Sequence, residues 1–357
     1  MIKSCYIHIP FCKNICSYCD FCKMYYNKDF IDKYLLSLEK EINLYYKNDL
    51  LNTLYIGGGT PSCLDEISLK KLFKIINIFK LNKTYEFTFE CNIEDINEKL
   101  LIFLKENKVN RISIGLQSFN KKYIEFMNRK YLNKKEITDK INLVKKYFNN
   151  INIDLIYGIN NETLKELQEE VDSFINLDVN HISLYSLILE DNTILKTKKY
   201  KEIDDDLNRK MYDYIRKTLK KNNYIHYEIS NFSKKGYMSK HNLCYWNNDN
   251  YYGFGLGSSG FVDNIRYTNT RSLNSYINGN YRYIKEKIDK KRNMEYEMIL
   301  NLRKIKGISK KNFYKKYNIN IKDVFDVSKL NENKYYFYIP KKYLFVENYI
   351  LCDFILD

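Results

Sequence analysis

Alanine is absent from the 357 residues, and the chain has only three prolines and one tryptophan. No run of apolar residues approaches the length of a membrane span, and the N-terminus lacks the basic and apolar blocks of a signal peptide. We therefore expect a cytoplasmic protein that is not an integral membrane protein. Because the reducing cytosol disfavours disulfides, the nine cysteines predict metal ligands or free thiols.

An acidic surplus is also missing, since 59 Lys and Arg residues against 44 Asp and Glu residues give a net charge of +15. The lysines are spread along the whole chain together with Asn, Ile and Tyr, residues that share A/T-rich codons. This spread indicates a base-composition effect and not a nucleic-acid-binding patch, so we expect no nucleic-acid partner. The hydrophobic share of 45% is typical of a globular protein.

Short β-branched runs alternate along the chain with longer amphipathic segments. Strands are predicted at residues 5–9, 53–56, 85–89, 111–114, 151–156 and 181–185. Helices are predicted at residues 30–46, 68–79, 96–105, 134–148 and 163–177. An alternation repeated about six times predicts an α/β fold whose parallel sheet, with right-handed crossovers, curls into an open or closed barrel.

Glycines and polar residues that could bind a ligand follow these strands directly. Glycines 57–59 and Thr60 come after the second strand, Glu90 after the third and Gln117 after the fourth, while Asp154 lies inside the fifth. Barrel proteins build their sites at the carboxyl ends of the strands, so these residues are expected to share one site.

The regular alternation stops beyond about residue 235. A Gly-rich stretch at residues 253–260 predicts close backbone packing or the approach of a ligand, and not a helix. From about Asn293 a helical pattern resumes and leads into a short Lys- and Tyr-rich unit, predicted as a small helical domain that ends in strands. The expected division is a barrel at residues 1–235, a connecting segment at 236–292 and a C-terminal domain at 293–357.

Three closely spaced cysteines stand near the N-terminus, Cys12, Cys16 and Cys19. Soft thiolates suit iron, and three of them on one loop leave one iron of a 4Fe-4S cluster open for a ligand. The alternative is a structural zinc site that adds Cys22. Structural zinc sites draw their ligands from two separated knuckles, so the spacing favours the cluster.

The strand before these cysteines and the turn after them, residues 6–11 and 18–21, resemble the radical S-adenosylmethionine signature. Over its whole length the chain resembles the oxygen-independent coproporphyrinogen III oxidase family, and within it the HemW-type haem chaperones. The motifs that support this resemblance lie at residues 6–12, 57–61, 113–119, 154–158, 227–232 and 241–246. The resemblance implies a radical SAM partial (β/α)6 TIM-like barrel with a small C-terminal HemN-type domain.

The resemblance also implies a set of cofactor residues. Cys12, Cys16 and Cys19 are the expected ligands of the cluster. The residues expected to contact S-adenosylmethionine (SAM) are Tyr6, Gly58, Gly59, Thr60, Glu90, Gln117, Arg129 and Asp154. Glycines let the backbone approach the methionine part, Glu90 can accept hydrogen bonds from the amino group or the ribose, and Arg129 can meet a carboxylate.

Two features separate the subfamilies. The oxidase has an extension ahead of the cluster and a cysteine where this chain has Phe21, whereas only eleven residues precede Cys12 here. The chaperones have the pattern His-Asn-x-x-Tyr-Trp, which residues 241–246 match. In the chaperones that histidine is implicated in holding haem, so His241 is the expected axial ligand. The alternative, a histidine that caps or hydrogen-bonds a loop, stays open.

Ile93, Tyr131, Ser259 and the pair at 159–160 depart from the family pattern, and these departures concern the substrate side more than the cofactor side. Three functions remain: a haem chaperone, an oxidase that decarboxylates coproporphyrinogen III, and a radical enzyme with another substrate. Whether the protein is an enzyme stays open. The chaperone resemblance implies haem or a porphyrin as ligand and allows apo-haemoproteins, an electron donor such as flavodoxin and a second copy of the chain as partners.

Overall fold

The computed structural model describes residues 2–356. Six strands that are neighbours in one sheet run parallel: β1 (Ser4–Ile9), β4 (Leu50–Gly58), β5 (Lys80–Asn92), β6 (Arg111–Gln117), β7 (Ile151–Tyr157) and β8 (His181–Ser186). All six predicted strands are confirmed. Most of their residues are buried. In β6 the apolar residues Ile112, Ile114 and Leu116 alternate with the polar residues Arg111, Ser113 and Gln117, so the two kinds of side chain point to opposite faces of the sheet.

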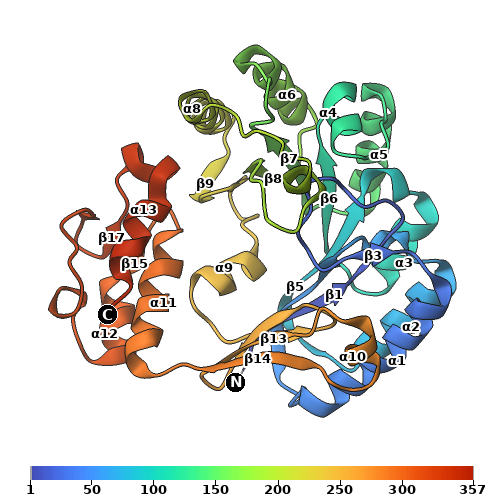
Figure 1. The fold of residues 1–357 in the computed structure, drawn as a ribbon, viewed down its shortest axis with the longest axis horizontal. Helices are drawn as coiled ribbons and strands as arrows, with labels where there is room; N and C mark the ends of the chain where they lie inside the picture. The colour runs from blue at the N-terminus through green and yellow to red at the C-terminus, as the bar shows by residue number, and fades with distance from the viewer. Residues whose placement is uncertain (1, 357) are drawn as a thin grey trace.

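The sheet has nine strands and extends beyond this parallel core on both sides. β11 (Tyr252–Phe254) pairs in parallel with β1 at one edge, and β10 (Asn231–Ser233) and β9 (Ile225–Glu228) continue antiparallel from β8 at the other. The order is β11-β1-β4-β5-β6-β7-β8-β10-β9, so in the described chain the barrel stays open between β11 and β9. The curved sheet and the helices around it are visible in Figure 1.

Helices connect the parallel strands. They are α1 (Lys28–Tyr45), α2 (Glu66–Ile76), α3 (Glu98–Glu106), α4 (Lys121–Phe126), α5 (Lys134–Tyr147) and α6 (Leu164–Asn176), while α7 (Ile194–Thr197) and α8 (Asp205–Lys221) lie between β8 and β9. Side chains one turn apart bury the inner face of each longer helix. In α6, for example, Leu167, Val171 and Phe174 are buried, and the helix starts with a reciprocal capping box between Thr163 and Glu166.

Close backbone packing in the Gly-rich stretch, as predicted, is confirmed. A Cβ at Gly253 would lie 1.8 Å from the Ser259 carbonyl oxygen, and one at Gly255 would lie 2.5 Å from the His8 carbonyl oxygen. The stretch forms β11 and leads into a three-stranded sheet of β12 (Ser259–Val262), β13 (Ile265–Asn269) and β14 (Arg282–Lys287), with α10 (Leu273–Ile277) between the last two.

The C-terminal part combines α11 (Lys290–Leu302) and α12 (Lys310–Tyr317) with a small sheet of β15 (Ile308–Ser309), β17 (Tyr336–Tyr338) and β16 (Asn331–Glu332). The prediction that it ends in strands is wrong, because α13 (Glu347–Leu351) and a 3-10 turn (Cys352–Phe354) follow the sheet. Figure 1 shows this part beside the open barrel, with the short helix α9 (Lys240–Trp246) between α11 and the sheet. The domain boundaries at 235 and 292 remain predictions.

Candidate cofactor site at the carboxyl ends of the strands

The cysteine loop runs between β2 (Phe11–Cys12) and β3 (Met24–Tyr25). Neighbouring elements hold its backbone in place. The Ser17 N–H donates to the Met127 carbonyl oxygen at 3.1 Å, the Asn128 side chain donates to the Ile15 carbonyl oxygen at 2.8 Å, and the Leu195 N–H donates to the Ser17 carbonyl oxygen at 3.1 Å. The loop therefore has a defined shape set by α4 and α7.

Cys12, Cys16 and Cys19 line one cavity of about 400 Å³. Burial raises the pKa of the Cys12 thiol to about 11, although the Thr60 hydroxyl donates to its Sγ at 3.5 Å and opposes the shift. A bound metal favours the thiolate and reverses such a shift. Among residues 2–356 no three His, Cys, Asp or Glu side chains are grouped as ligands of a single ion, whereas a four-iron cluster distributes its thiolates over several irons.

Cys22 does not line this cavity. A Cβ at Gly257 would lie 2.5 Å from Cys22 Cβ and 3.0 Å from its Sγ, so Cys22 packs against the Gly-rich stretch. This placement separates Cys22 from the three thiols that the spacing assigns to the cluster.

The loop after β4 requires glycine for steric reasons. A Cβ at Gly59 would lie 2.8 Å from Cys12 Sγ, and one at Gly57 would lie 2.6 Å from the carboxyl carbon of Glu90. Gly58 has a φ of +119°, and a Cβ there would meet the His8 ring. The glycines thus let a cluster cysteine and a carboxylate approach the same stretch of backbone.

Glu90 is held on both carboxylate oxygens. The Tyr55 hydroxyl donates to Oε1 at 2.6 Å, and the Gly58 N–H donates to Oε2 at 3.0 Å. Burial raises the pKa of Glu90 to about 7, and the nearby Asp154 carboxylate adds to the rise, while the Tyr55 and Gly58 donors and the Arg111 charge oppose it. The carboxylate therefore has a fixed orientation.

The other predicted SAM residues on this side are also on the cavity wall. Arg129 donates from Nη2 to Asn92 Oδ1 at 3.0 Å and to the Gly115 carbonyl oxygen at 2.8 Å. Asp154 accepts from Asn152 Nδ2 at 2.8 Å, and burial raises its pKa. Gln117, at a φ of +70°, has a buried Oε1 with no hydrogen-bond partner. A free buried acceptor suits a ligand hydroxyl or amino group, so this wall fits a polar ligand such as SAM.

The structure adds residues to the cavity that the sequence interpretation missed. The clearest is Arg111, which is 2% exposed, donates to Thr88 Oγ1 at 3.5 Å and has an Nε with no partner. Its charge lowers the pKa of both Glu90 and Asp154 and so partly offsets their burial. An arginine at the start of an otherwise apolar strand was the available signal. Tyr55, Asn152 and Tyr185 also line the cavity.

Tyr6 and His241 lie outside the cavity wall. Tyr6 shares a hydrogen bond of 2.9 Å with His8 Nδ1. The His241 ring is 1% exposed, and both its nitrogens have partners: Thr53 Oγ1 at 2.8 Å from Nδ1 and the Tyr245 hydroxyl at 2.7 Å from Nε2. Axial ligation of haem by His241 requires release of one of these bonds, whereas a hydrogen-bonded structural histidine needs no change.

Together, the open barrel and the three-cysteine cavity define a radical SAM protein, and residues 6–174 match the model of the Radical SAM superfamily. That superfamily implies a 4Fe-4S cluster and SAM. The chain is 38% identical to the heme chaperone HemW of Lactococcus lactis subsp. lactis over 332 residues, 90% of this chain and 87% of that protein. It is also 38% identical to the heme chaperone HemW of Bacillus subtilis over 339 residues, 91% of this chain and 89% of that protein. The chain belongs to the HemW family.

The fold has a close match among solved structures. The coproporphyrinogen III oxidase HemN of Escherichia coli, a radical SAM enzyme, superposes with a TM-score of 0.86 over 99% of this chain and 90% of that chain. At 19% identity this likeness concerns the fold alone. It confirms the predicted fold class. No helix in residues 2–356 is long and apolar enough to cross a membrane.

Proposed function

We propose that this protein is a haem chaperone that binds a 4Fe-4S cluster, SAM and haem and delivers haem to apo-haemoproteins. The observation that carries the proposal is the 38% identity with heme chaperones over nine tenths of the chain. Cys12, Cys16 and Cys19 would hold the cluster, and Gly58, Gly59, Thr60, Glu90, Gln117, Arg129 and Asp154 would surround SAM. When bound, the cluster and SAM supply electron transfer and a reactive sulfonium group.

The chain's own residues prepare this cavity for charged and polar ligands. Glu90 and Asp154 offer acceptors for an amino group and for hydroxyls, and Arg129 offers a cation for a carboxylate. Their hydrogen bonds to Tyr55, Gly58, Asn92, Gly115 and Asn152 fix these groups before a ligand enters. Such preorganisation reduces the entropy lost on binding.

Haem is a flat apolar ring with two propionates, and the rim of the same cavity offers matching contacts. Phe21 and Ile188 line it and are each 62% exposed, and Tyr185 beside them is 42% exposed. Lys23, also on the rim, supplies a cation for a propionate. We place haem at this rim. Ligation by His241, a flavodoxin-like electron donor and a homodimer remain predictions.

A titration tests the haem part of the proposal. Cluster-loaded protein is titrated with haem and followed at the Soret band, and saturable binding with a shifted band is expected. Phe21→Ala should weaken binding by about 1–2 kcal/mol, since it removes apolar contact area. Tyr349→Ala is the matched control, because Tyr349 is an aromatic residue 71% exposed on α13, outside the cavity wall. A Soret band identical to that of free haem would contradict haem binding.

A further inference from the structure

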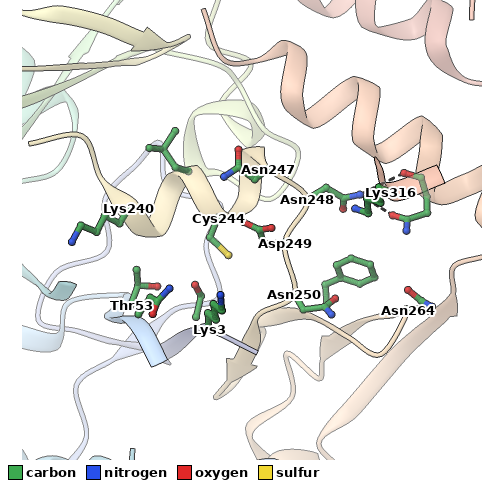
Figure 2. Close-up of a pocket in the computed structure, with 15 residues that line it drawn as sticks. Lys3, Thr53, Lys240, Cys244, Asn247, Asn248, Asp249, Asn250, Asn264 and Lys316 are labelled. Atoms are coloured by element: carbon green, nitrogen blue, oxygen red, sulfur yellow. Dashed lines mark hydrogen bonds between the residues drawn. The ribbon is translucent and has the colours of Figure 1, made fainter. Parts of the chain in front are cut away.

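Helix α9, which contains the His-Asn-x-x-Tyr-Trp motif, lies between two cavities. Asn242 lines the cofactor cavity, whereas Lys240 and Cys244 line a second cavity of about 680 Å³ on the other side of the helix. Figure 2 shows this second cavity, with Thr53 of β4 beneath α9. The helix therefore forms part of the wall between the cofactor cavity and the second cavity.

The barrel fixes the start of α9. The backbone N–H groups of Lys240 and His241 donate to the two carboxylate oxygens of Glu86 on β5, at 3.1 and 3.0 Å. A carboxylate at a helix N-terminus satisfies free donors and meets the positive end of the helix dipole. Glu86 is 3% exposed, so this anchor lies inside the fold. The position of His241 is consequently set by strand β5.

His241 also connects α9 to strand β4, through Thr53. Its hydrogen bonds to Thr53 and Tyr245 fix the plane of the ring, and burial lowers its pKa to about 3, so the ring is neutral at ordinary pH. The ring packs on Tyr55, with centroids 5.0 Å apart and planes at 32°. The Tyr55 hydroxyl in turn donates to Glu90 Oε1.

We propose that His241 is a positioning residue for the SAM site: it holds the Tyr55 ring so that the Tyr55 hydroxyl fixes the Glu90 carboxylate. The proposal rests on the SAM binding proposed above, and it gives His241 a role at the cofactor site that needs no contact with haem. Loss of the imidazole leaves a void against Tyr55, and the freed ring no longer holds Glu90 in one orientation.

Calorimetric titration of cluster-loaded protein with SAM tests the proposal. His241→Ala and Tyr55→Phe should each weaken SAM affinity by roughly three- to tenfold, the effect of one lost hydrogen bond. The variant with both changes should be no weaker than the weaker single variant, because both act through the same bond. A purely structural histidine would not produce this non-additivity.

Two further variants make the experiment decisive. His226→Ala is the matched control: His226 also packs on an aromatic ring, Phe232 at 4.3 Å between centroids, but does not contact Tyr55, so SAM affinity should be unchanged. Thr53→Val removes only the hydroxyl that fixes His241 and serves where His241→Ala does not fold. It should weaken SAM binding in the same direction.

The outcomes separate this proposal from the haem proposal. Wild-type SAM affinity in His241→Ala, or additive losses in the double variant, would overturn the positioning role. A shifted Soret band in His241→Ala with unchanged SAM affinity would also overturn it, in favour of axial ligation. Normal SAM binding by a wild-type protein that binds no haem would instead refute the chaperone function and leave the positioning role in place. A wild-type protein that binds no SAM would refute both.

Discussion

Replacement of Gly59 by alanine provides a severe test of the cluster site. The backbone at Gly59 has no left-handed φ, so the cost of a side chain there is steric alone. The added Cβ would lie 2.8 Å from Cys12 Sγ, 2.8 Å from the Pro10 carbonyl carbon and 2.9 Å from the Phe11 carbonyl oxygen. Ordinary contacts begin near 3.4 Å, so each neighbour must move by about half an ångström or more.

Two of these three neighbours are backbone atoms that cannot rotate away. The Gly59 N–H donates to Ile9 at 2.8 Å and the Thr60 N–H donates to Phe11 at 2.9 Å, so the two segments are tied together. We expect Gly59→Ala to lower the free energy of unfolding by about 1–3 kcal/mol, the usual cost of overpacking. Because Cys12 Sγ is displaced, the variant should also take up less iron.

Iron content after anaerobic reconstitution and a denaturant titration measure the two effects. Gly236→Ala is the matched control: its φ is +91° and nothing lies within 4 Å of an added Cβ. That variant should lose about 1–2 kcal/mol through backbone strain and keep full iron content. A Gly59→Ala protein with the same iron content as Gly236→Ala would refute the assignment of Cys12 and this loop to the cluster.

Three further outcomes are expected. Alanine at any of the three cluster cysteines should abolish the cluster, whereas Cys22→Ala should keep about four irons per chain by iron analysis. The opposite pattern would contradict the assignment of the cluster ligands. Asp154→Ala should weaken SAM binding by about 1–3 kcal/mol in calorimetry with the cluster intact. An unchanged affinity would show that SAM does not bind at Asp154. Because the folded-state pKa of Glu90 is raised to about 7, its contribution to stability is present below about pH 4.5 and is lost as the pH rises through 7. Glu90→Gln should therefore flatten the stability profile in that window, and an unchanged profile would contradict the raised pKa.

The periodic elements were predictable because their signal is local. The parallel strands contain short runs of buried β-branched and other apolar residues, and the helices between them repeat apolar residues every turn. Helix α8 is absent from the predicted helices although Met211, Tyr212, Ile215 and Leu219 have the same spacing, so its signal was available. The strands β15, β16 and β17 have two or three residues each, too few to show a period, and the order of the C-terminal part was accordingly wrong.

The candidate site divides in the same way. The cysteine spacing, the residues that follow the strands and the family resemblance together indicated ten of the residues that line the cavity, about a third of its wall. The environment of His241 was not predictable, because its partner Thr53 is 188 residues away and the contact with Tyr55 depends on how α9 packs on the sheet. A motif shows which residues occur together, but burial and hydrogen bonding decide which of them can reach a ligand.

Transfer of haem tests the central claim most directly. Cluster-loaded protein charged with haem is mixed with an apo-haemoprotein in the presence of SAM, and the Soret band of the acceptor is followed with time. We predict that the acceptor gains its native band while this protein loses its own. Retention of haem by this protein, or conversion of coproporphyrinogen III to protoporphyrinogen in a parallel reaction that contains SAM and a reductant for the cluster, would contradict the chaperone account.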